Sequence, residues 1–115
     1  MTMTNEPLEK RPVHSMIPAV DIVETANSYI VKLDIPGSVK EKIKASIENS
    51  TLVISAEALE YTGVEKSESV KQYRREFLLA KDIEVNTVDA QYDLGVLTVV
   101  LNKKQQFLPK QISIN

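Results

Sequence analysis

The sequence contains no cysteine, and this absence excludes a whole group of sites and activities. Without cysteine, the 115-residue chain has no disulfides, zinc knuckles, iron–sulfur clusters or thiol nucleophiles. A single histidine leaves too little for a metal cluster or a Ser-His-Asp arrangement. The three glycines, Gly37, Gly63 and Gly95, are too far apart to form a glycine-rich phosphate loop. We therefore predict no catalytic residues, no bound metal and no cofactor.

The charge is also too balanced for a nucleic-acid partner. The net charge is -2 and the isoelectric point is near 5.4, so no basic stripe for phosphate contacts is present. The distribution is uneven, because residues 103–115 carry +3 and residues 1–18 carry no net charge. This leaves -5 for residues 19–102, so a basic tail follows an acidic body.

Long apolar runs are missing as well. No stretch approaches the ~18 consecutive apolar residues of a membrane-spanning helix. The first residues contain no apolar run of the kind found in signal peptides. We expect a soluble, cytoplasmic protein without a membrane span.

What the sequence does contain is apolar residues with a period of two, which is typical of β-strands. Tyr29, Val31, Leu33 and Ile35 share one face of such a run. Two further runs flank Asn49-Ser50, which indicates a hairpin. At least six short strands are predicted, covering residues 19–24, 29–35, 43–47, 51–56, 72–79 and 96–101. Their spacing predicts an all-β fold, an antiparallel β-sandwich.

The segments around these strands have other signals. Ser38 and Glu41 match a capping box after Pro36-Gly37, which predicts one helical turn over residues 38–41. The charged residues 57–71 predict a solvated loop rather than paired carboxylates for acid–base chemistry. The run over residues 96–101 is apolar on both faces, so we expect it between two layers.

The ends of the chain show no periodicity. Residues 1–16 predict a short flexible N-terminal arm, in which we expect His14 to be solvated. Residues 17–103 form the predicted domain, and residues 104–115 form a C-terminal extension. The extension ends in Ile112-Ser113-Ile114, two isoleucines with the spacing of one strand face.

Three motifs in this order resemble the small heat-shock protein (alpha-crystallin) family. The first begins at Pro18-Ala19-Val20 and continues to Pro36-Gly37. The second spans residues 90–97 and is similar to the family's Ala-x-x-x-Asn-Gly-Val-Leu, with Leu94 in place of the asparagine. Its matching residues are Ala90, Gly95, Val96 and Leu97. The third is the tail tripeptide, which matches the family's Ile-x-Ile/Val.

The resemblance implies an immunoglobulin-like sandwich, the alpha-crystallin domain, and an ATP-independent holdase activity. Such a chaperone binds unfolding proteins as an oligomer of dimers and prevents their aggregation. In the family, the tail isoleucines, here Ile112 and Ile114, dock in an edge groove between the fourth and eighth strands of a neighbour. The groove candidates in this sequence are Ile43, Ala45, Ile47, Val88, Ala90 and Tyr92.

The resemblance also implies a dimer interface. Some relatives swap a strand from the loop into the partner, and residues 61–65 have room for a brief swapped strand around Val64. In other relatives this strand fuses with the next and pairs edge to edge. We prefer the swapped form, and Arg75 stands where the family has an interface arginine. Gly95 is expected in a turn with positive φ, and Leu97 in the core.

Two other functions use the same sandwich and stay open. One is a CS-domain-like cochaperone or adaptor that binds a single partner. The other is a structural coat protein that uses the domain for assembly. The arm has few large apolar residues, so we expect smaller assemblies than are common in the family.

Overall fold

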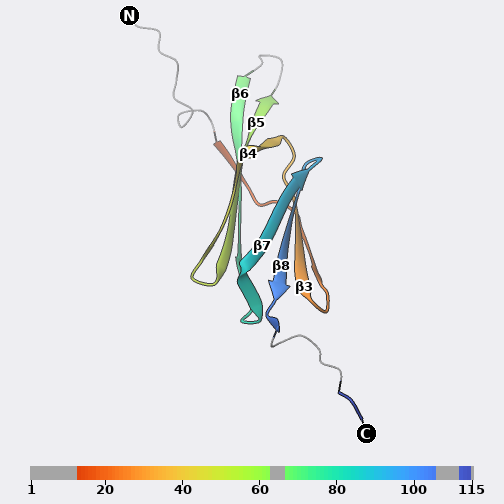
Figure 1. Ribbon diagram of the computed structural model, residues 1–115. Coiled ribbons are helices and arrows are strands. Elements are labelled where there is room, and N and C mark those ends of the chain that lie inside the picture. The colour runs from red at the N-terminus through yellow and green to blue at the C-terminus, as the bar shows by residue number, and fades with distance from the viewer. Residues whose placement is uncertain (1–12, 63–66, 106–111, 115) are drawn as a thin grey trace, which may run out of the picture.

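The computed structural model describes residues 13–62, 67–105 and 112–114, and these form a sandwich of two four-stranded sheets (Figure 1). One sheet has the strand order β1 (Val13–Met16), β6 (Ser67–Leu78), β5 (Thr51–Thr62) and β4 (Ser38–Glu48). The other has the order β2 (Val20–Glu24), β3 (Ser28–Asp34), β8 (Val96–Lys103) and β7 (Ile83–Asp93). The predicted all-β sandwich is confirmed. Along the described residues, no helix is long and apolar enough to cross a membrane.

The core lies between the two sheets. Val31, Leu33 and Ile35, in β3 and just after it, are buried, as the period of two predicts. Fully burying a side chain of this size contributes about 1.5–3 kcal/mol. Across the core lie the buried residues of β5 and Tyr73 of β6, while β8 and Ile83 of β7 contribute buried residues from the sheet that contains β3. Only one face of β8 is fully buried: Val96, Thr98 and Val100 on the other face are half-buried, so the expected second layer covers one side alone.

The turn between β4 and β5 confirms the predicted hairpin. Asn49 and Ser50 have φ values of 50° and 60°, the conformation of a two-residue type I′ turn. The β7–β8 hairpin turns in the same way at Leu94, with φ 49°, and Gly95, with φ 81°. The positive φ expected at Gly95 is therefore confirmed.

The predicted helical turn over residues 38–41 is wrong, because these residues begin β4. The Ser38 hydroxyl, which would have capped a helix, donates a 2.7 Å hydrogen bond to the Glu57 carbonyl oxygen on β5. Gly37 has φ 84°, so the chain reverses there without a helix. The pairing between β4 and β5 is irregular between Ser38 and Ile43.

The predicted solvated loop over residues 57–71 is also wrong for its described residues. Strands β5 and β6 pair in one continuous ladder that ends at Thr62 and Ser67. Ala58 and Val70 on this ribbon are buried. Val64, around which a swapped strand was expected, lies outside the described residues.

Two strands fall outside the six predicted runs. Residues 13–16, assigned to the flexible arm, form β1, which pairs in parallel with Val70–Tyr73 of β6. His14 is exposed on this strand. The other is β7, whose pairing with β8 shifts register between Ile83 and Val88. Except for β1 with β6, the described strands pair in antiparallel fashion.

Candidate functional site

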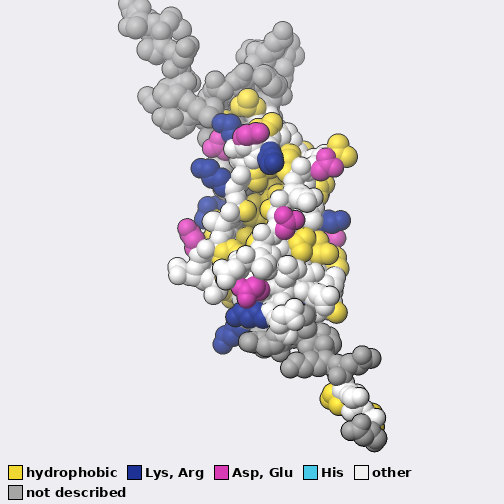
Figure 2. Space-filling view, in the orientation of Figure 1, with side chains coloured by type: hydrophobic (Ala, Val, Ile, Leu, Met, Phe, Trp, Pro, Cys, Tyr) yellow, Lys and Arg dark blue, Asp and Glu magenta, His cyan; other side chains and the backbone are white. Residues whose placement is uncertain are grey.

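A groove runs along one open side of the sandwich, where β4 ends one sheet and β7 ends the other. Its volume is about 240 Å³. Figure 2 shows apolar side chains between the sheets on the face that includes β7, with charged side chains of both signs around them. We call it the β4–β7 groove, and it is lined by Lys40, Ile43, Ala45, Ala90, Tyr92 and Leu97.

Four of the six groove residues named from the sequence line this groove: Ile43, Ala45, Ala90 and Tyr92. The other two, Ile47 and Val88, do not line it; they pack against the core, as Ile43 and Tyr92 also do. Their register partners, Leu52 and Leu101, place each of them two residues beyond Ala45 and Ala90 on its strand. Sequence reasoning missed Lys40 because it lies in the irregular part of β4, and it assigned Leu97 to the core alone.

Tyr92 fixes one wall of the groove. Its hydroxyl donates a 2.7 Å hydrogen bond to the Ile35 carbonyl oxygen and lies 3.3 Å from that of Ser38. The Ile35 amide in turn donates to the Gly95 carbonyl oxygen at 2.8 Å. These bonds tie β7 and its turn to the segment between β3 and β4, which fixes the position of the Tyr92 side chain at the groove.

The groove has the chemistry of a peptide-binding edge rather than of a catalytic centre. Among the described strands, β4 and β7 each pair on one side only, so each presents backbone amides and carbonyls along its outer edge. An extended segment can pair with such an edge while alternate side chains enter an apolar groove. Within the described residues, no three histidine or acidic side chains are placed to hold a metal ion.

The tail isoleucines are available for such a contact. Ile112 and Ile114 are 84% and 92% exposed, and both lie outside the strands. Two isoleucines separated by one residue point to the same side of an extended segment. They match the spacing of Ala90 and Tyr92 on β7, which also face the groove together.

Arg75, the predicted interface arginine, lies half-buried on β6. Its guanidinium carbon is 5.5 Å from the centroid of the Phe77 ring, within the range of a cation–π interaction. Its neighbour Arg74 instead forms an exposed ion pair with Glu76 at 3.6 Å. In the part of the chain that the structure describes, β1 covers only Val70–Tyr73, so β6 has an open outer edge over residues 74–78.

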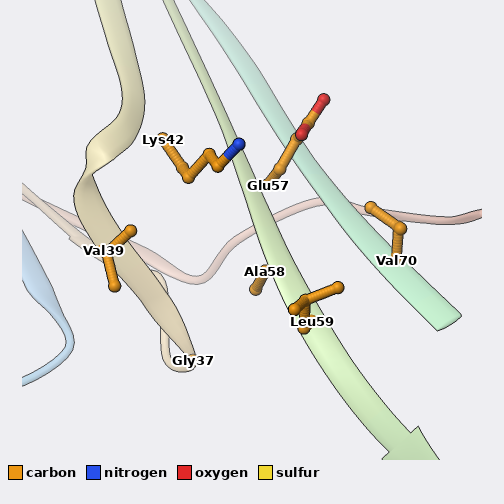
Figure 3. A pocket seen from close by; sticks show the side chains of 7 residues that line it. All are labelled: Gly37, Val39, Lys42, Glu57, Ala58, Leu59 and Val70. Carbon is orange, nitrogen blue, oxygen red and sulfur yellow. The ribbon is translucent and has the colours of Figure 1, made fainter. Parts of the chain in front are cut away.

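A smaller apolar hollow of about 190 Å³ lies where β4 begins (Figure 3). Val39 of β4 and Leu59 of β5 form its walls, and Lys42 and Glu57 lie on one side of it. Sequence reasoning missed this hollow because residues 57–71 read as a solvated loop.

A polar cluster fixes the end of β8, where the tail begins. The Lys103 ammonium forms an ion pair with Glu24 at 2.8 Å and lies 5.0 Å from the centroid of the Tyr29 ring. The Tyr29 hydroxyl donates to the Asp82 carboxylate at 3.0 Å. Burial, with this hydrogen bond, raises the pKa of Tyr29, and the bond to Glu24 raises the pKa of Lys103.

Sequence comparison relates this chain to plant heat shock proteins. It is 35% identical over 103 residues to the 17.4 kDa class III heat shock protein of Arabidopsis thaliana, which covers 79% of this chain and 66% of that protein. It is 37% identical over 98 residues to the 17.8 kDa class I heat shock protein of the same plant, which covers 76% and 60%. The chain thus spans at most about two thirds of the length of these curated relatives.

The fold is also similar to that of heat shock proteins with solved structures. Heat shock protein 16.0 from Schizosaccharomyces pombe superposes with a TM-score of 0.68 at 23% identity, covering 88% of this chain and 77% of that one. The model of the Hsp20/alpha crystallin family matches residues 21–115, which include the β4–β7 groove and the tail motif. The chain therefore belongs to the Hsp20/alpha-crystallin family of small heat-shock proteins, which are generally ATP-independent chaperones and not enzymes.

Proposed function

We propose that this protein is a holdase that binds unfolding proteins without ATP and keeps them from aggregating, as an oligomer of dimers in the cytoplasm. An unfolding client exposes apolar surface and unpaired strand edges. The β4–β7 groove offers both kinds of partner on one side of the domain, an apolar surface and two open strand edges. This groove is the observation on which the proposal rests.

Assembly uses the same groove. Ile112 and Ile114 of one chain dock in the β4–β7 groove of a neighbour and pair along its edges. Burying both isoleucines contributes about 3–6 kcal/mol before the cost of ordering the tail. That ordering cost offsets much of the gain, so each single contact is weak. Many weak contacts in one assembly hold it together and still allow subunits and clients to exchange.

Charge favours this approach. The tail residues 103–115 carry +3, while residues 19–102 carry -5. Opposite charges speed encounter and orient it, and added salt weakens that attraction. Lys40 at the groove has the same sign of charge as the tail. The attraction therefore comes from the acidic domain as a whole rather than from the groove itself.

The dimer forms through the open edge of β6. The β5–β6 ladder continues to Thr62 and Ser67, which leaves residues 63–66 to connect the two strands and favours edge-to-edge pairing over a swapped strand. Residues 74–78 of two chains meet antiparallel in this arrangement. Arg75 and Phe77, already in contact within one chain, then lie at the centre of the interface.

The test is light scattering from a model client heated until it aggregates, with an equimolar amount of this protein and no nucleotide. The proposal predicts strong suppression of scattering, and added ATP changes nothing. An inert protein at the same mass concentration controls for crowding. Undiminished aggregation together with a monomeric mass contradicts the proposal and favours the CS-domain-like adaptor. Undiminished aggregation with a large, intact assembly favours the structural coat protein.

A further inference from the structure

A second groove lies on the side of the sandwich opposite the β4–β7 groove. Its volume is about 360 Å³, and it opens between β2, the outer strand of one sheet, and the end of β6 in the other. We call it the β2–β6 groove. Residues that line it include Ile22, Tyr29, Phe77, Leu78, Ile83 and Leu101.

Apolar side chains at the rim of this groove are exposed to solvent. Ile22 is 53% exposed and Leu78 is 84% exposed. Within residues 13–62, 67–105 and 112–114, β1 covers β6 only over Val70–Tyr73, so its cover ends before the groove begins. An exposed apolar groove of this kind marks a surface that another segment covers.

The C-terminal extension starts at the edge of the same groove. The Lys104 amide donates a 2.6 Å hydrogen bond to the carbonyl oxygen of Asp82, the residue before the groove residue Ile83. The Lys103 amide donates to Asn27 at 2.8 Å, and its ammonium pairs with Glu24. The backbone at Lys104 is therefore fixed beside the groove wall.

The residues that follow have the right chemistry to fill it. Phe107 and Leu108 are the large apolar residues between this anchor and the Ile-x-Ile motif. Two residues separate Lys104 from Phe107, so the three steps between them span at most about 10 Å. Proline favours an extended backbone at the residue before it, and neighbouring side chains of an extended segment would reach opposite walls of a groove between two sheets.

Charge supports the same placement. Glu76 lies among the groove residues, and Glu24 and Asp82 lie at the anchor. The extension, residues 104–115, carries Lys104 and Lys110 and no acidic residue. An acidic border therefore faces a basic segment, which favours docking of this segment.

We propose that Phe107 and Leu108 dock in the β2–β6 groove of their own chain. The contact covers the groove and shortens the free part of the tail, because Ile112 then lies at most about 14 Å from the docked Leu108. This last consequence rests on the proposed function, since it limits which neighbouring grooves the isoleucines reach. The docking itself needs no contact of the tail isoleucines with a neighbour, but it shares Phe77 and Leu78 with the β6 edge proposed for the dimer.

Tryptophan fluorescence tests the docking directly, because the chain contains no tryptophan of its own. We expect Phe107→Trp to emit at shorter wavelength than the control Gln105→Trp, whose position is exposed. Adding Leu78→Lys at the exposed rim should shift the emission of Phe107→Trp to longer wavelength. Emission equal to that of the control, or insensitive to Leu78→Lys, overturns the proposal.

Cysteine trapping distinguishes the chain's own groove from that of another copy. The sequence has no cysteine, so Leu108→Cys with Ile22→Cys forms a unique pair. We expect oxidation to give a cross-linked monomer on a denaturing gel, also when Ile112→Gly and Ile114→Gly remove the tail motif. A cross-linked dimer assigns the groove to a second copy, and no cross-link contradicts the docking. Neither result bears on client protection, so the two proposals fail separately.

Discussion

The Tyr92 hydroxyl donates a 2.7 Å hydrogen bond to the Ile35 carbonyl oxygen, linking the edge strand β7 to the residue that follows β3 in the same sheet. Ile35 is fully buried, so its carbonyl has little access to water and depends on this partner. The bond therefore contributes both to the stability of the domain and to the shape of the β4–β7 groove.

Removing this hydroxyl should destabilise the domain measurably. We expect Tyr92→Phe to lower the free energy of unfolding by about 0.5–1.5 kcal/mol, because the Ile35 carbonyl loses a buried hydrogen bond. Tyr73→Phe is the matched control, since the Tyr73 hydroxyl makes only a long 3.5 Å contact with the Pro36 carbonyl oxygen. Urea denaturation measures both variants. Equal losses contradict the role given to Tyr92.

Leu94 holds a backbone conformation that suits leucine poorly. Its φ is 49°, and its side chain is 93% exposed, so no packing compensates for the strain. Left-handed backbone costs ordinary residues about 1–2 kcal/mol, and asparagine adopts it more easily. We therefore expect Leu94→Asn to raise the free energy of unfolding by about 1 kcal/mol. Leu94→Ala keeps the Cβ atom and should bring no such gain. Equal denaturation midpoints for the two variants contradict the strain.

The proposed dimer interface depends on Arg75 rather than on its neighbour Arg74. Truncation of an arginine at the centre of an interface commonly costs more than 1 kcal/mol, so Arg75→Ala should weaken dimerisation about tenfold. Arg74→Ala removes only an exposed ion pair and serves as the control. Sedimentation equilibrium of both variants, in a chain that lacks the tail isoleucines, gives the dimer dissociation constants. Dissociation constants that agree for both variants contradict the interface.

The cluster at the end of β8 predicts a loss of stability at alkaline pH. Tyr29 and Lys103 both have raised pKa values in the folded protein, so folding favours their protonated forms. Their contribution is complete below about pH 10, the ordinary pKa of these groups, and is lost as pH rises through the folded values. Denaturant unfolding between about pH 8 and pH 11 should show this decline. Tyr29→Phe should make the decline shallower, and an unchanged pH dependence contradicts the coupling.

The sequence predicts the strands well where their pairing is regular. The hairpin at Asn49-Ser50 and the buried face of β3 both follow from apolar alternation and turn chemistry. Prediction failed at two irregularities, between Ser38 and Ile43 in β4 and between Ile83 and Val88 in β7. Each shift changes which face the following residues occupy, so a simple period of two does not describe the whole strand.

The β4–β7 groove could not be predicted from local sequence patterns. Ile43 and Ala90 come from separate sheets, and no local pattern shows that β4 and β7 end on the same side. Only the family resemblance paired them, and it extended the set to Ile47 and Val88, which do not line the groove. The long β5–β6 ribbon was hidden for another reason, since its charged residues mask the alternation of Ala56 and Ala58.

The central claim, that tail isoleucines join subunits through the β4–β7 groove, is tested most directly by native mass spectrometry. We expect an assembly of several dimers for the unaltered chain and a single dimer for the double variant Ile112→Gly, Ile114→Gly. Ala45→Arg, which blocks the groove at an exposed position, should give the same dimer, whereas Ser46→Arg on the opposite face should not. An assembly of unchanged mass in both the tail variant and the groove variant contradicts the account.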